Sequence, residues 1–122
     1  MPIRNFLTMP AASFVCHDGE GEVDSVTVYG KPDLDSALQF LHYTVVPPGA
    51  SIGLHRHGND EELYIVLEGT GVMAVDGTKT PVAKGDAILN KPFGEHALYN
   101  TSPTDALKIL VLEAQAAKAG AP

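Results

Sequence analysis

The sequence predicts a single all-β domain, and three observations lead to that prediction. Its 122 residues match one domain of ordinary size. Hydrophobic residues make up 44% of the chain, which is enough to bury a core. Twelve glycines and nine prolines are spread along the chain and divide it into many short segments. Short segments between frequent turns are typical of a β-sandwich or a closed barrel.

The expected strands are runs of β-forming residues, each ended by a turn signal. Pro47, Pro48 and Gly49 stop one run, and the pair Asp76-Gly77 is the strongest hairpin signal, because type I′ turns need positive φ at both central positions. In chain order, strands are expected at residues 23–29, 38–46, 51–56, 62–68, 72–75, 78–83, 87–90, 96–100 and 106–113. The chain then divides into an N-terminal arm (1–22), a barrel (23–113) and a flexible, alanine-rich tail (114–122).

The charge, the hydropathy and the cysteine content of the chain predict which partners and which compartment it has. The formal net charge is −7 and no run of basic residues is present, so we expect no binding of nucleic acid. No apolar stretch reaches the length of a transmembrane helix, so we expect no membrane contact. Cys16 is the single cysteine, so no intrachain disulfide can form and the fold needs no oxidising compartment. A cytoplasmic protein is expected.

Histidines and a carboxylate are spaced so that they can bind one metal ion. His55 and His57 are two residues apart in an extended segment, so both imidazoles project from the same face. The chain reverses at 58–60, which brings a carboxylate at the start of the next strand toward the same ion. His96 follows after two further turns and is a fourth candidate, although a single histidine is more often a structural residue. Imidazole and carboxylate are ligands that first-row divalent metals accept.

These residues also match two motifs of a known family, the cupins. The first motif, G-x5-H-x-H-x3–4-E-x6-G, is matched by Gly49, His55, His57, Glu62 and Gly69. The second, G-x5-P-x-G-x2-H-x3-N, is matched by Gly85, Pro92, Gly94, His96 and Asn100, with the proline and second glycine one place later than in the consensus. The sequence therefore resembles a small single-domain cupin across residues 49–100.

The resemblance implies a fold, a metal site and an assembly. The fold is a double-stranded β-helix, or jelly-roll barrel. One divalent transition metal ion (zinc, manganese, iron, nickel or cobalt) is bound inside it by His55, His57, Glu62 and His96. The spacing to Gly69 selects Glu62 over Glu61, which is expected to face solvent. Small cupins commonly pair, so a homodimer is also expected.

Other residues are candidates for contact with a small-molecule substrate. His42 lies in an apolar run and is a candidate general base, with a hydrogen-bonded core histidine as an equal alternative. Tyr43 has the opposite parity, so at most one of the two faces inward. Tyr64 shares the face of Glu62 and is a second catalytic candidate. The candidates for substrate binding are Phe93, Tyr99 and Asn100, and aromatic packing explains the aromatic ones equally well. His17 is expected to be exposed in a glycine-rich loop.

The metal set predicts chemistry on a small oxygen-rich molecule. We expect a metal-dependent enzyme whose ion acts as a Lewis acid on an enolisable or carboxylate substrate, in a cyclisation, an isomerisation or a decarboxylation. One alternative is a dioxygenase that uses iron, manganese or nickel. The other is a cupin that binds a small molecule without turning it over.

Overall fold

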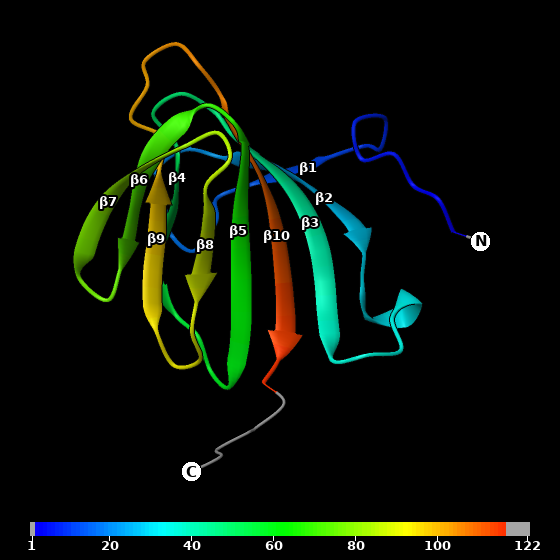
Figure 1. The fold of residues 1–122 in the computed structure, drawn as a ribbon. Coiled ribbons are helices and arrows are strands. Elements are labelled where there is room, and N and C mark those ends of the chain that lie inside the picture. Colours follow the sequence, from blue (N-terminus) through cyan, green and yellow to red (C-terminus); the bar gives the residue numbers. More distant parts are fainter. Residues whose placement is uncertain (1, 117–122) are drawn as a thin grey trace.

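The computed structural model describes residues 2–116 and shows an all-β fold of two antiparallel sheets (Figure 1). A short 3₁₀ helix, Lys31–Asp33, follows the second strand. In chain order, the strands are β1 (Ala12–Phe14), β2 (Val23–Tyr29), β3 (Leu38–Val46), β4 (Ser51–Arg56), β5 (Asp60–Glu68), β6 (Thr70–Val75), β7 (Thr78–Ala83), β8 (Ala87–Asn90), β9 (Glu95–Tyr99) and β10 (Leu107–Gln115).

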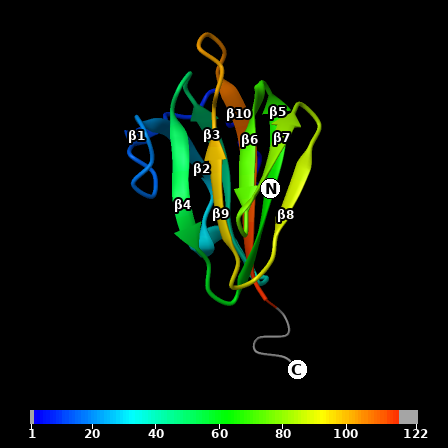
Figure 2. The same ribbon diagram turned by 90° about the vertical axis from the view of Figure 1, so that its left-hand side faces the viewer.

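The two sheets face each other, as the turned view in Figure 2 shows. The larger sheet has the strand order β1-β2-β3-β10-β5-β8, and the smaller has the order β4-β9-β6-β7. From β3 onward the chain passes back and forth between the sheets, because β3, β5, β8 and β10 belong to one and β4, β6, β7 and β9 to the other. This alternation is the topology of a jelly roll, and it confirms the predicted fold class.

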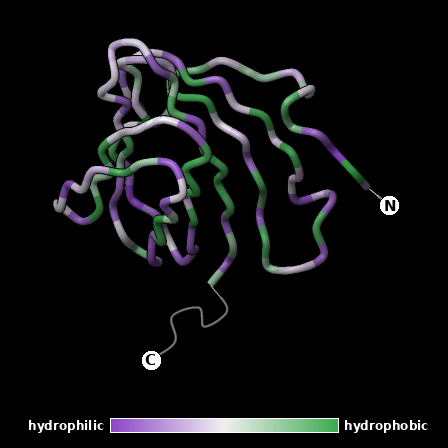
Figure 3. Tube along the Cα trace, turned by 45° about the horizontal axis from the view of Figure 1, so that its top comes forward, coloured by the Kyte–Doolittle hydropathy of each residue, from purple (hydrophilic) through white to green (hydrophobic). Residues whose placement is uncertain are grey.

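The main core lies between the sheets and follows from alternation along the strands. In β5, Glu62, Tyr64 and Val66 are buried and face inward, while Leu63, between the first two, is exposed. The same alternation of every second residue places Leu107 and Ile109 of β10 in this core. Apolar and polar positions therefore follow one another closely along the chain trace in Figure 3.

A second, smaller core lies on the outer face of the larger sheet. Tyr43 of β3 is 8% exposed there, and the ring of Phe6 packs against it with the ring centroids 4.5 Å apart. Because Tyr43 points outward under the N-terminal segment, its neighbour His42 points into the barrel. The structure thus decides which of these two side chains faces the interior.

The first 22 residues, expected to form an arm, contact both sheets. β1 pairs with β2, and the loop that follows is hydrogen-bonded to β4 of the other sheet. The carbonyl of Cys16 accepts a hydrogen bond from Gly53 N (3.0 Å), and Ser51 N donates to the carbonyl of Glu20 (2.9 Å). A Cβ atom at Gly53 would lie 2.0 Å from the carbonyl oxygen of His17, so this close approach requires glycine.

Most strand boundaries agree with those expected. The predicted strands 23–29, 38–46, 51–56, 78–83 and 87–90 are confirmed at both ends. At the hairpin, Asp76 and Gly77 have φ values of 48° and 85°, as a type I′ turn requires. β10 continues through Gln115 into the expected tail, and residues 117–122 of that tail lie outside the described part of the chain. Within residues 2–116, no helix is long and apolar enough to cross a membrane.

Candidate metal centre

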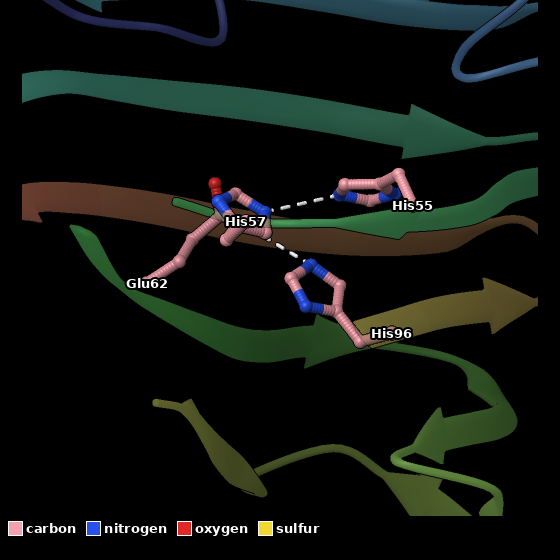
Figure 4. Close-up of side chains that lie close together, drawn as sticks. All are labelled: His55, His57, Glu62 and His96. Atoms are coloured by element: carbon pink, nitrogen blue, oxygen red, sulfur yellow. Dashed lines mark hydrogen bonds and ion pairs between the residues drawn. The ribbon is translucent and has the colours of Figure 1, made fainter. Parts of the chain in front are cut away.

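The four predicted metal ligands meet between the two sheets. His55 of β4 and His96 of β9 are directly opposite each other in the smaller sheet. Glu62 enters from β5 in the larger sheet, and His57 follows immediately after β4. Figure 4 shows the three imidazoles and the carboxylate grouped around one region. One ligand atom from each residue lies within 4.8 Å of the others.

The atoms at the centre of this cluster are the Nε2 atoms of the histidines and one oxygen of Glu62. The Nε2 atoms of His55 and His57 are 3.1 Å apart. Oε1 of Glu62 lies 3.3 Å from His57 Nε2 and 3.1 Å from His96 Nε2. Ligands about 2.1 Å from a common ion, with bond angles of 90–110°, lie about 3.0–3.4 Å from one another. The cluster therefore has the spacing of a metal coordination shell.

The outward-facing nitrogens show why a cation fits here. Nδ1 of His55 lies 2.7 Å from the carbonyl oxygen of Gly53, which can only accept, so Nδ1 carries the hydrogen. Nδ1 of His57 lies 3.1 Å from Asp60 Oδ1 and 3.3 Å from Glu113 Oε1, and it likewise donates. A ring whose only hydrogen is on Nδ1 has a lone pair on Nε2, and the Nε2 atoms of His55 and His57 face each other across 3.1 Å. A cation between two such lone pairs turns their repulsion into coordination.

Burial and neighbouring groups keep two of the ligands in the protonation states that metal binding needs. Burial lowers the pKa of His55 to about 4, so this imidazole is neutral at pH 7. Burial alone would raise the pKa of Glu62, but the hydrogen bond from His96 and the charges of His57 and His96 outweigh it and lower that pKa. Glu62 is therefore an anion at neutral pH, although it is only 5% exposed.

The neighbouring glutamate, Glu61, points away from the cluster. Its carboxylate forms an ion pair with Lys91 Nζ at 3.3 Å near the surface. The structure thus agrees with the choice of Glu62 over Glu61 as the ligand.

Two outer carboxylates hold His57, and sequence reasoning overlooked both. Asp60 is at the start of β5, and Glu113 pairs with Glu62 across β10 and β5. Burial, followed by the charges of Glu62 and Asp60, raises the pKa of Glu113 to about 8. The sequence did contain a signal for Glu113, because it lies two residues after the inward-facing Val111 and so shares its face.

A cavity of about 290 Å³ opens onto three of the four predicted metal ligands, His55, His57 and Glu62. Both predicted catalytic residues, His42 and Tyr64, line it. Burial lowers the pKa of His42, and burial together with Glu62 raises the pKa of Tyr64 well above 10. The cavity is lined by Phe14, Cys16, His17, Val23, Ser25, Phe40, His42, Thr44, Ile52, His55, His57, Glu62, Tyr64, Val111 and Glu113.

The three candidates for substrate binding are not among these lining residues. Phe93 is 56% exposed in the turn before β9. The amide of Asn100 is buried and donates to the carbonyls of Val46 (2.9 Å) and Asp105 (2.8 Å), which is a structural contact. Tyr99 lies at the end of β9, where Lys79 Nζ is 5.8 Å from its ring centroid. The structure therefore does not bring these three side chains to the metal ligands.

Two stacked ring pairs line the cavity instead. The ring of His17 lies over that of His55, with a centroid separation of 3.6 Å and an interplanar angle of 11°. The rings of Phe40 and His42 stack at 3.9 Å and 17°. His17 is exposed, as expected, but the hydrogen bonds between its loop and β4 place it beside the site. That contact between distant segments has no sequence signal.

Several known proteins are similar to this chain. An oxalate-binding protein of Thermotoga maritima is 29% identical over 114 residues, which cover 92% of this chain and 94% of the relative. An uncharacterized protein of Methanocaldococcus jannaschii is 42% identical over 72 residues, which cover 59% of this chain and 57% of the other.

Solved structures agree with this similarity. The structure of a predicted oxalate decarboxylase from T. maritima matches with a TM-score of 0.89 at 26% identity, covering 94% of this chain and 99% of that one. The polyketide cyclase RemF from Streptomyces resistomycificus matches with a TM-score of 0.78 at 21% identity, covering 93% and 79%, and shares the fold. Residues 42–113, more than half of the chain, match the sequence model of the cupin domain. The chain therefore belongs to the cupin family.

Proposed function

We propose that this cupin binds one divalent transition metal ion through His55, His57, Glu62 and His96 and uses it to activate a small oxygen-rich acid. The observation that carries the proposal is the convergence of three Nε2 atoms and Glu62 Oε1 on one point at the cavity. The cavity gives a ligand access to that point. The T. maritima relative, named for oxalate binding, supports a small acid held through its oxygen atoms.

A cation bound here would supply Lewis acidity toward a carboxylate, carbonyl or enolate oxygen. The residues of the chain would orient the ion and set the charge of its surroundings. His55 and His57 are held in one tautomer by Gly53, Asp60 and Glu113, so their Nε2 atoms are oriented before any ligand enters. Glu62 supplies one negative charge, so a site that holds a divalent cation would keep a net positive charge that attracts an anion.

His42 would serve as the proton carrier. Its imidazole lines the cavity, and because burial lowers its pKa, it is neutral at pH 7 and can accept a proton from a ligand carbon or hydroxyl. Tyr64 would act differently. Because its pKa is well above 10, it stays protonated and donates a hydrogen bond next to Glu62. These roles suit cyclisation, isomerisation or decarboxylation, each of which moves a proton at an activated acid or enol.

The proposal is tested by loading the protein with zinc and with cobalt and screening small 2-oxo acids, hydroxy acids and dicarboxylates by NMR. We expect turnover of at least one acid with either metal and a drop of at least about 100-fold in His42→Ala, because a positioned general base typically contributes that much. Metal content is measured on the same samples. Further samples are loaded with iron, manganese and nickel, and oxygen consumption in any of these would indicate the dioxygenase instead. Ligand-induced shifts without any turnover would indicate a binding protein.

A further inference from the structure

We infer that His17 is a positioning residue for the metal site: its ring holds the imidazole of His55 toward the bound ion and slows the release of that ion. The inference rests on the proposed metal site and concerns a residue outside the predicted ligand set. Three observations carry it: a ring stack, the hydrogen bonds between the loop of His17 and β4, and the backbone conformation of that loop.

The ring of His17 covers one face of the ring of His55. The two ring centroids are 3.6 Å apart and the interplanar angle is 11°, so the rings overlap face to face. At its edge, the His55 ring is held by one contact, from Nδ1 to the carbonyl oxygen of Gly53 at 2.7 Å. A single contact at one atom leaves the imidazole free to tilt, and a second ring against its face restricts that tilt. Histidines that bind metals depend on such outer partners for the orientation of their rings.

Hydrogen bonds on both sides of His17 bind its loop to β4, and the loop runs beside this strand in Figure 2. Before His17, the carbonyl of Cys16 accepts from Gly53 N (3.0 Å). After it, Glu20 N donates to Ser51 Oγ (2.8 Å), and Ser51 N donates to the carbonyl of Glu20 (2.9 Å). Because β4 is an edge strand of the smaller sheet, a covering loop is useful to the fold alone. Edge covering explains these backbone contacts, but it does not explain the placement of the His17 ring.

The backbone at His17 has an unfavourable conformation. His17 and Asp18 have φ values of 50° and 56°, in the left-handed region that residues other than glycine rarely adopt. Such conformations persist only where the surrounding structure fixes them, and they concentrate at functional sites. The hydrogen bonds to β4 supply the fixation here. The loop is therefore held in the one conformation that lays the His17 ring on that of His55.

His17 also lies at the opening of the cavity, because it lines the cavity and is nevertheless exposed. From this place its ring covers His55 on the side from which water or a chelator reaches the ion. Release of the ion requires Nε2 of His55 to let go and water to take its place. An imidazole that is fixed and covered rebinds the ion before water replaces it, so we expect slow release.

The test measures how fast cobalt leaves the loaded protein after excess chelator is added at pH 8, where an ordinary histidine is neutral. We expect His17→Asn to release cobalt about tenfold faster than the wild type, because losing an outer partner of a metal ligand typically costs about 10–100-fold in affinity. Asparagine tolerates the left-handed conformation but has no ring, so this variant removes the stack and keeps the loop. The visible spectrum of the bound cobalt should change as well, because the His55 ring is no longer fixed.

Two further variants locate the effect in the ring. His17→Phe restores a flat ring without its nitrogens and should release cobalt within about twofold of the wild-type rate. Asp18→Asn, in the same turn but outside the cavity lining, is the matched control and should release cobalt as the wild type does. The free energy of unfolding of metal-free His17→Asn, measured in urea, should stay close to that of the wild type, because the replaced side chain is exposed.

Three results would overturn the inference. Equal release rates for the wild type and His17→Asn would refute the role of His17 while leaving the metal site and the proposed function in place. Rapid release from a well-folded His17→Phe, or a loss of folding stability in metal-free His17→Asn large enough to explain its faster release, would do the same. Failure of the wild-type protein to retain any cobalt, measured by elemental analysis, would remove the inference together with the proposed function.

Discussion

At the scale of single residues, the adjacent pair Glu61 and Glu62 provides a direct test of the ligand set. Glu62 is buried against two imidazoles, whereas Glu61 is paired with Lys91 near the surface. We predict that Glu62→Ala lowers metal affinity by at least about 100-fold, because even the loss of an outer partner of a ligand costs 10–100-fold. Glu61→Ala should bind metal almost as the wild type does. Equal losses in the two variants, measured by competition with a chromophoric chelator, would contradict this ligand set.

Glu113 couples the stability of the metal-free protein to pH. Its pKa is about 8 in the folded chain, against an ordinary value of 4.5. Between these two values the folded chain holds a proton that the unfolded chain has released. The free energy of unfolding contributed by this group is therefore fully present below pH 4.5 and is lost as pH rises toward and through 8.

We predict that Glu113→Gln removes this loss, because glutamine has no proton to release. Relative to the wild type, the metal-free variant should gain stability steadily between pH 5 and pH 8 in urea unfolding. Glu61→Gln is the control, and its free energy of unfolding should depend on pH in the same way as that of the wild type. If the free energies of unfolding of the wild type and of Glu113→Gln differed by the same amount at every pH, this role of Glu113 would be contradicted.

At the scale of elements, sequence reasoning found the strands well because their local signals were strong. β2, β3, β4, β7 and β8 carry clear β-forming runs ended by glycine, proline or asparagine, and all five have the expected bounds. The metal ligands were found because two family motifs specify their spacing. β1 was missed because it has only three residues, all exposed, and it forms only by pairing with β2.

The part of the site that escaped sequence reasoning depends on contacts between distant segments. His17 lies beside His55 only because its loop is bonded to β4. Phe40 shares the strand face of His42, but its stack on the His42 ring is seen only in the structure. Phe93 and Tyr99 were candidates for substrate contact, with aromatic packing as an equal explanation, and neither of them lines the cavity. Local patterns identified the ligands, while the cavity wall required the three-dimensional arrangement.

Gly53 tests how firmly the first loop is bound to β4. Its position leaves no room for a Cβ, which would lie 2.0 Å from the carbonyl oxygen of His17 and 2.8 Å from Gly19 N. We predict that Gly53→Ala lowers the free energy of unfolding by about 1–3 kcal/mol, as overpacking usually does. Gly58→Ala, where no atom lies within 4 Å of the added Cβ, should be close to neutral in the same denaturant titration. Equal stability of the two variants would refute the close approach.

At the scale of the whole molecule, we propose the outer face of β5 and β8 as the interface of the homodimer that the resemblance to small cupins implies. Leu63 and Leu89 are paired across β5 and β8 and are 36% and 48% exposed, so two exposed apolar side chains lie side by side there. We predict that the wild type sediments as a dimer and that Leu63→Lys with Leu89→Lys shifts it toward monomer, since buried charge at an interface is costly. Leu54→Lys, on the smaller sheet, should leave the dimer intact. Dissociation by Leu54→Lys alone would place the interface elsewhere.

The metal cluster also links the two sheets, because His55 and His96 belong to one and Glu62 to the other. A cation bound there should stabilise the fold as a whole, in proportion to the logarithm of its concentration relative to its dissociation constant.

The most direct test of the account is a crystal structure of the cobalt-loaded protein with anomalous data collected at the cobalt edge. The account predicts one anomalous peak per chain, about 2.0–2.2 Å from the Nε2 atoms of His55, His57 and His96 and from a carboxylate oxygen of Glu62. A structure with His96 turned away from the other three, or with no cobalt between the sheets at neutral pH, would contradict it.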